Sequence, residues 1–179
     1  EAATALKSMT LIIDRNPAPV AATFAFSDGY RNASAGSDRK LSTRVRVDAF
    51  SRVRAVIETV DGKLYMASKF VVGAGGCSAP ASKDPDQSLA EMGRTQMKVF
   101  GDEGADPREV QIMMRHPNFT GMQMDKKTGD FTPARYVNYI EVRAGEAMLF
   151  RMEGGISISE DPNIRFTYAP SSRAVLEFS

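Results

Sequence analysis

The sequence predicts an all-β protein made of two antiparallel β-sandwiches joined by a linker. Short segments throughout the chain alternate apolar and polar residues with a period of two, which is typical of half-buried strands. Turn-forming Gly, Pro, Asn and Asp residues separate these segments, and helical spacing is nearly absent. A third observation divides the chain: residues 79–94 contain prolines, small residues and charges, which is the composition of a linker.

Residues 1–78 are expected to form the first domain. Its predicted strands cover residues 8–14, 20–26, 41–47, 53–59 and 64–72. The clearest alternation is in 41–47, and Asp61-Gly62 is a strong signal for a hairpin between the last two strands. Short strands without helical periodicity are typical of an antiparallel sandwich.

Residues 95–179 are expected to form the second domain, again a sandwich of short strands. Its predicted strands cover residues 96–100, 109–115, 136–144, 147–152, 164–168 and 174–178. A short helix capped by Asp86 or Ser88 is expected in the linker. Residues 118–127 show no period, so we expect a long loop there.

Size and composition limit the function. A chain of 179 residues fits one or two small domains, and it has no run of the ~20 apolar residues that a membrane helix needs. The net charge of +1 and the absence of Trp do not suit nucleic-acid binding. The single His excludes a two-histidine metal site within one chain. Because Glu1 is not a natural initiator, we expect a processed or trimmed amino terminus.

Cys77 is the only cysteine and follows a glycine-rich segment. An internal disulfide is therefore impossible, and the thiol is free for an external partner, including a second copy of the chain. Gly73, Gly75 and Gly76 are expected to act as the hinge of a mobile arm that displays the thiol. The alternative is a flexible linker with an incidental cysteine.

Arginines supply candidate positive charge for this thiol. Arg44 and Arg46 share one side of the predicted strand 41–47, where they could lower the thiol pKa or contact an anion or a partner protein. Arg52 and Arg54 form a second such pair. The alternative is the ordinary solvated face of a half-exposed strand.

Other chemistry has weaker support. Four methionines near His116 could bind Cu(I), but methionine also commonly fills gaps in a core; they are Met113, Met114, Met122 and Met124. We find no pattern of catalytic residues, so the sequence predicts no enzyme, no catalytic or metal-binding residue and no cofactor.

Several motifs, in order, resemble the SoxY and SoxZ subunits of a sulfur carrier, and most closely the quinoprotein dehydrogenase-associated SoxYZ-like carrier family. The SoxY-like part covers about residues 5–78 and includes residues 7–17, 42–47, Asp61-Gly62 and the Gly75-Gly76-Cys77 end. The SoxZ-like part covers about residues 95–179 and includes His116-Pro117, Thr120-Gly121, 125–129, 133–138 and 157–163.

The resemblance implies two immunoglobulin-like domains, a periplasmic location and a non-enzymatic role, with Cys77 as the covalent attachment point of a sulfur-containing intermediate. Implied partners are sulfur-oxidation proteins or proteins of a quinoprotein dehydrogenase system, without nucleic acid or membrane. An alternative is a docking adaptor for a quinoprotein alcohol dehydrogenase, with Cys77 redox-active or vestigial.

Two departures from the family pattern affect these expectations. Ser78-Ala79-Pro80 stands where the carrier arm has further glycines, so the arm is tethered at both ends. The first domain lacks the initial strands of a full SoxY domain, which would leave one sheet edge unpaired or completed by another polypeptide. Strand exchange, or a disulfide dimer through Cys77, is therefore a possible mode of association.

Overall fold

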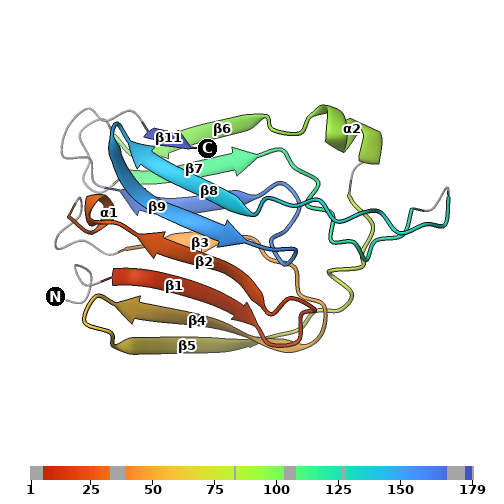
Figure 1. Ribbon diagram of the computed structural model, residues 1–179, viewed down its shortest axis with the longest axis horizontal. Coiled ribbons are helices and arrows are strands. Elements are labelled where there is room, and N and C mark those ends of the chain that lie inside the picture. The colour runs from red at the N-terminus through yellow and green to blue at the C-terminus, as the bar shows by residue number, and fades with distance from the viewer. Residues whose placement is uncertain are drawn as a thin grey trace.

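The structure is a computed structural model that describes residues 6–32, 39–82, 84–102, 108–125, 128–168 and 176–178. Before the glycine-rich segment, the strands are β1 (Leu6–Ile13), β2 (Val20–Phe26), β3 (Leu41–Thr43), β4 (Ser51–Thr59) and β5 (Leu64–Val71). After it come β6 (Thr95–Phe100), β7 (Arg108–Met114), β8 (Tyr139–Ala144), β9 (Ala147–Gly154), β10 (Asn163–Tyr168) and β11 (Leu176–Phe178). The helices are α1 (Asp28–Asn32) and α2 (Pro85–Ala90) (Figure 1).

These strands form two antiparallel sheets. In the described ranges, the larger sheet has seven strands in the order β11-β8-β9-β2-β1-β4-β5, and the smaller has four in the order β3-β10-β7-β6. Every pair of neighbouring strands is antiparallel. The predicted all-β class with immunoglobulin-like antiparallel sheets is confirmed, but the two separate sandwiches expected over residues 1–78 and 95–179 are not seen among the described strands, because each sheet takes strands from both ranges.

Both sheets contain strands from both halves of the chain. In the larger sheet β2 pairs with β9, which places Phe24 opposite Met152. In the smaller sheet β3 pairs with β10, which places Thr43 opposite Ile164. Backbone hydrogen bonds therefore join the first and second halves of the chain within each of the two sheets.

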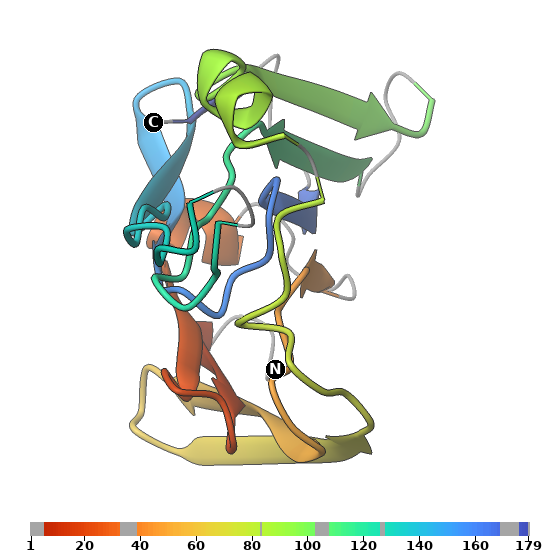
Figure 2. The same ribbon diagram turned by 90° about the vertical axis from the view of Figure 1, so that its right-hand side faces the viewer.

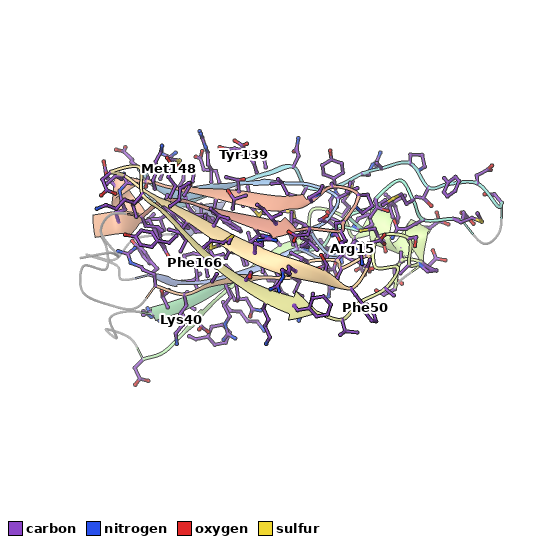
Figure 3. All side chains as sticks on the ribbon, turned by 90° about the horizontal axis from the view of Figure 1, so that it is seen from below. Arg15, Lys40, Phe50, Tyr139, Met148 and Phe166 are labelled. Carbon is purple, nitrogen blue, oxygen red and sulfur yellow. The ribbon has the colours of Figure 1, made fainter. Side chains whose placement is uncertain are left out.

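A shared apolar core fills the space between the sheets. Phe150 of β9 is fully buried, and its ring contacts Phe24, Phe26, Tyr30 and Phe166 at centroid distances of 5.0 to 6.1 Å. Phe166 lies between the layers in Figure 3, while Tyr139 lies on the outer side. The core therefore combines β2 and α1 of the first half with β9 and β10 of the second.

The β4–β5 hairpin extends beyond this core and forms one end of the larger sheet (Figure 2). Large apolar side chains of β5 are more than half exposed, among them Leu64, Tyr65, Met66 and Phe70. β5 is an edge strand within the described part of the chain, so its outward backbone groups face solvent.

Several predicted elements differ in length from the observed ones. The strand expected over 41–47 ends at Thr43, and Val45 forms only an isolated bridge to Ile158. The strand expected over 136–144 begins at Tyr139, because the Val137 N–H donates to the Asn118 side chain instead of to a neighbouring strand. Helix α1 lies between the strands expected over 20–26 and 41–47, where no helix was expected. Part of the last predicted strand, residues 174 and 175, lies outside the described residues.

Candidate functional site

Cys77 lies at the junction of the two halves, and its side chain is buried, with a relative exposure of 0%. The expectation that the thiol is displayed on a mobile arm is therefore wrong for this structure. The two residues before Cys77 are held against the first half by backbone hydrogen bonds: Gly75 N–H donates to Asp48 O (2.7 Å) and Gly76 N–H donates to Val47 O (3.2 Å). We call residues 73–79 the cysteine segment.

The glycines of this segment permit close packing. A Cβ atom on Gly76 would lie 2.5 Å from Val47 O, and one on Gly73 would lie 2.9 Å from a methyl carbon of Val47. Gly75 has a φ of +64°, a backbone conformation that side chains other than glycine rarely adopt. The sequence analysis took these glycines as a hinge, and the structure gives them a second role, because they bring the segment into contact with Val47.

Asp48 fixes the backbone of Cys77 directly. Its carboxylate Oδ1 accepts a hydrogen bond from the Cys77 N–H at 3.0 Å. Asp48 is held in turn by buried Asn16, whose Oδ1 accepts from the Asp48 N–H and whose Nδ2 donates to Arg46 O and Ser157 Oγ. This network ties residues 46–48 to both halves of the protein.

Side chains of the second half cover the other side of the cysteine segment. Thr120 Oγ1 donates to Cys77 O at 2.6 Å, and Gln123 Nε2 donates to Ala79 O at 3.0 Å. Gln123 Oε1 also accepts from the Thr120 N–H. Both side chains are almost completely buried, so their hydrogen bonds to the cysteine segment are shielded from water.

Arg46 bridges the two halves at the same place. Its guanidinium donates to Gly76 O (3.2 Å) and to Asn118 O (3.3 Å), while Nε is buried and has no hydrogen-bond partner in the described structure. Burial lowers the pKa of Arg46. Arg44 is placed differently: it lines a cavity of about 450 Å³ with Arg94, Arg115 and Asp161. The structure therefore brings Arg46, but not Arg44, into contact with the cysteine segment.

The second predicted arginine pair has other partners. Arg54 forms a bidentate ion pair with Asp14 at 2.7 and 2.8 Å, which lowers the pKa of Asp14. Arg52 lies on the same strand as an exposed residue. Neither side chain has a recorded contact with the cysteine segment, so Arg46 is the arginine whose charge acts on Cys77.

The surroundings of Cys77 favour the neutral thiol. Burial, followed by the negative charge of Asp48, raises the pKa of Cys77 to about 11 from an ordinary value of 9.0. The positive charge of Arg46 acts in the opposite direction and does not overcome them. The thiolate is the nucleophilic form of cysteine, so the buried group is unreactive at neutral pH.

His116 and the nearby methionines show structural contacts. His116 Nδ1 accepts from the Asn118 N–H at 3.0 Å, and burial lowers the pKa of the imidazole. Met114 lies against the core, while Met124 is about half exposed. Among the described residues, no group of three or more His, Cys, Asp or Glu side chains could hold a metal ion.

Sequence reasoning missed several residues that position Cys77. Asp48 and Thr120 bond to Cys77 and Gln123 bonds to Ala79, and all three lie in segments without periodicity, so these contacts arise only through tertiary folding. One signal was available: Thr120-Gly121 belongs to the motif that carried the SoxZ resemblance.

Comparison with protein families divides the chain at this site. Residues 1–77 match the family described as "Sulfur oxidation protein SoxY", and residues 99–179 match "Sulphur oxidation protein SoxZ". The matches support a SoxYZ-like fused protein. They also support a carrier or partner role in sulfur oxidation. Searches of curated proteins and of solved structures returned no match. In the described part of the SoxYZ-like chain, no helix has the length and apolarity to cross a membrane.

Proposed function

We propose that this protein is a periplasmic carrier that holds a sulfur-containing group covalently on Cys77 and presents it to partner enzymes. One observation supports the proposal most strongly: the SoxY match ends at residue 77, which is the only cysteine, and that residue is packed against the SoxZ-like half. A cysteine with a purely structural role would not require a glycine-rich segment that is held by side-chain hydrogen bonds from both halves.

The buried thiol gives the carrier a closed state. With its pKa raised to about 11, Cys77 is a neutral thiol at neutral pH and is shielded from adventitious reagents. Loading therefore requires a second state in which the cysteine segment leaves Val47 and Thr120, because an enzyme must reach the sulfur atom. The glycines that permit close packing also permit this movement.

Cys77 can be loaded from tetrathionate by exchange of one S–S bond for another, which requires no external oxidant. The Cys77 thiolate attacks a sulfane sulfur of tetrathionate, one S–S bond forms, and the central S–S bond of tetrathionate breaks. Thiosulfate leaves with the electron pair, and the protein retains an S–SO₃⁻ group on Cys77. When thiosulfate itself is the donor, the same product forms with release of two electrons, which a partner enzyme must pass to an electron acceptor.

Intact-mass analysis tests the carrier role. After incubation with tetrathionate, we expect the protein to gain the mass of one S–SO₃ group and to lose it on treatment with a thiol reductant. The matched control is Cys77→Ser, which should gain nothing. A wild-type protein that stays unmodified even when its thiol is made accessible by mild denaturant would contradict the proposal.

Neither matched family description names a quinoprotein dehydrogenase. No observation therefore favours the adaptor alternative over the carrier.

A further inference from the structure

We propose that the cavity lined by Arg44 binds a small, doubly charged sulfur oxyanion, such as thiosulfate or tetrathionate, and so concentrates anionic sulfur donors next to Cys77. We call it the arginine cavity; its charged side chains are Arg44, Arg94, Arg115, Glu91 and Asp161. This inference rests on the proposed carrier function, because it names the class of donor that reaches the same thiol.

The arginine cavity lies on the outer face of the smaller sheet. Ile112 of β7 is buried in the core, so its neighbour Met113 is directed to the opposite face of the sheet. Met113 pairs with Gln96 of β6 on one side and with Asn163 of β10 on the other, and all three line the cavity. Its volume of about 450 Å³ is ample for a small anion together with bound water.

Two of the arginines face each other at the end of the β6–β7 ladder. The Arg115 N–H donates to Arg94 O at 2.7 Å, which continues the register of the paired strands by one residue. The Gly93 N–H then donates to Arg115 O at 2.8 Å. Like charges directly opposite each other in an antiparallel pair are destabilising. An anion bound between Arg94 and Arg115 would remove this repulsion.

The charge of the cavity also favours an anion. Asp161 forms an ion pair with Arg115 at 2.5 Å, and Glu91 is the second carboxylate, so the three arginines leave an excess of one positive charge. Within the described ranges, the side chains of Arg44 and Arg94 have no recorded hydrogen bond or ion pair. Their planar guanidinium groups match the oxygen atoms of an oxyanion in charge and geometry.

The rest of the lining favours a sulfur oxyanion over phosphate. Met113 and Met114 line the cavity beside the arginines, and their thioether side chains are apolar and polarisable. The oxygen atoms of thiosulfate can accept hydrogen bonds from arginine while its terminal sulfur atom lies against methionine. Phosphate has oxygen atoms on every side, so it leaves polar atoms against the methionines.

The arginine cavity is close to the cysteine segment. Arg44 is two residues before Arg46, so their Cα atoms are at most about 7 Å apart. The Arg46 guanidinium donates to Gly76 O, next to Cys77. An anion held by Arg44 is therefore beside the residue that contacts the cysteine segment.

Anion binding is tested by titrating the isotopically labelled protein with thiosulfate at constant ionic strength and following backbone amide chemical shifts. We expect saturable shifts at Gly93, Arg115 and Asn163 and none in β5. The Cys77→Ser variant should give the same result, because this binding is not covalent. Thiosulfate should bind more tightly than phosphate; equal affinities, or no saturable shift, would overturn the proposal.

Variants of opposite charge locate the anion. Arg44→Gln and Arg94→Gln should each weaken thiosulfate binding about tenfold, because each removes a charge-assisted hydrogen bond. Glu91→Gln should strengthen binding, an effect that a general loss of stability cannot produce. The matched control is Arg52→Gln, which removes the same charge from β4 of the larger sheet and should bind like wild type. Wild-type affinity in both cavity arginine variants would overturn the site.

Delivery to Cys77 is tested by the rate of modification of the isolated protein. The double variant Arg44→Gln with Arg94→Gln should react with tetrathionate, a dianion, about tenfold more slowly than wild type at low reagent concentration. With 4,4′-dithiodipyridine, an uncharged reagent, the two proteins should react equally. Equal rates with tetrathionate would overturn the role of the cavity in supplying Cys77.

Failure of the carrier function gives a different result. If wild-type Cys77 gains no S–SO₃ group even when it is accessible, the carrier function is contradicted. The thiosulfate titration would still decide whether the arginine cavity binds a sulfur oxyanion.

Discussion

At the scale of single residues, burial of Cys77 and then the charges beside it set the pKa of its thiol, and so the pH at which its sulfur can react. Asp48 binds the Cys77 N–H and raises the thiol pKa, while Arg46 binds the neighbouring carbonyl and lowers it. The two effects come from residues only two positions apart in the chain. A substitution at Asp48 that keeps the hydrogen bond to the Cys77 N–H but removes the charge therefore changes the pKa of the thiol without releasing the cysteine segment.

Asp48→Asn tests this balance. The amide keeps an oxygen that can accept the Cys77 N–H but removes the negative charge, so the pKa of Cys77 should fall below about 11. The reaction rate with an uncharged thiol reagent should then reach half its maximum at lower pH, and at pH 8 it should exceed the wild-type rate. The full pH profile of modification is the measurement. Unchanged profiles would mean that burial alone sets the acidity.

At the scale of elements, the cysteine segment is a loop that depends on contact with Val47. Its glycines were predicted from the sequence to be a hinge, yet two of them lie so close to Val47 that a side chain would collide with it. Composition alone does not distinguish a glycine that moves from one that packs, because both roles need the absence of a Cβ atom. Here the contact with Val47 shows that Gly73 and Gly76 lack a Cβ atom because the segment packs closely.

Gly76→Ala should disturb this contact. The new methyl group would lie 2.5 Å from Val47 O, so the segment must shift. We expect a loss of about 1–3 kcal/mol in unfolding free energy, as for other overpacked sites, with faster modification of Cys77. Chemical denaturation and thiol kinetics measure the two effects. Gly155→Ala is the control, because its Cβ would meet Val20 O at an ordinary 3.7 Å; equal behaviour of both variants would contradict the packing role.

At the scale of the whole molecule, the two halves depend on each other for both sheets and for the core. β2 pairs with β9, β3 pairs with β10, and the rings of Phe24, Phe150 and Phe166 meet between the layers. We therefore expect the halves to unfold together. Opening of the Cys77 site then requires a local movement of the cysteine segment rather than separation of the halves.

Phe150→Ala tests this dependence. Removing a fully buried ring that contacts aromatic residues of both halves should lower the unfolding free energy by about 3–5 kcal/mol. Denaturation followed by circular dichroism and by tyrosine fluorescence should give one coincident transition. Phe131→Ala, at a site 63% exposed, should change the unfolding free energy by less than about 0.5 kcal/mol. Two separate transitions would show that the halves fold independently.

The amino-acid sequence by itself determined the fold class, the approximate positions of most strands and the importance of Cys77. These depend on local properties: alternation with a period of two, turn residues, and a single cysteine after glycines. Only the tertiary structure decided that the halves share both sheets, that the thiol is buried, and that Asp48, Thr120 and Gln123 hold it. These features depend on contacts between residues about 30 to 45 positions apart or more, and no local pattern records which distant side chain will donate to a given carbonyl.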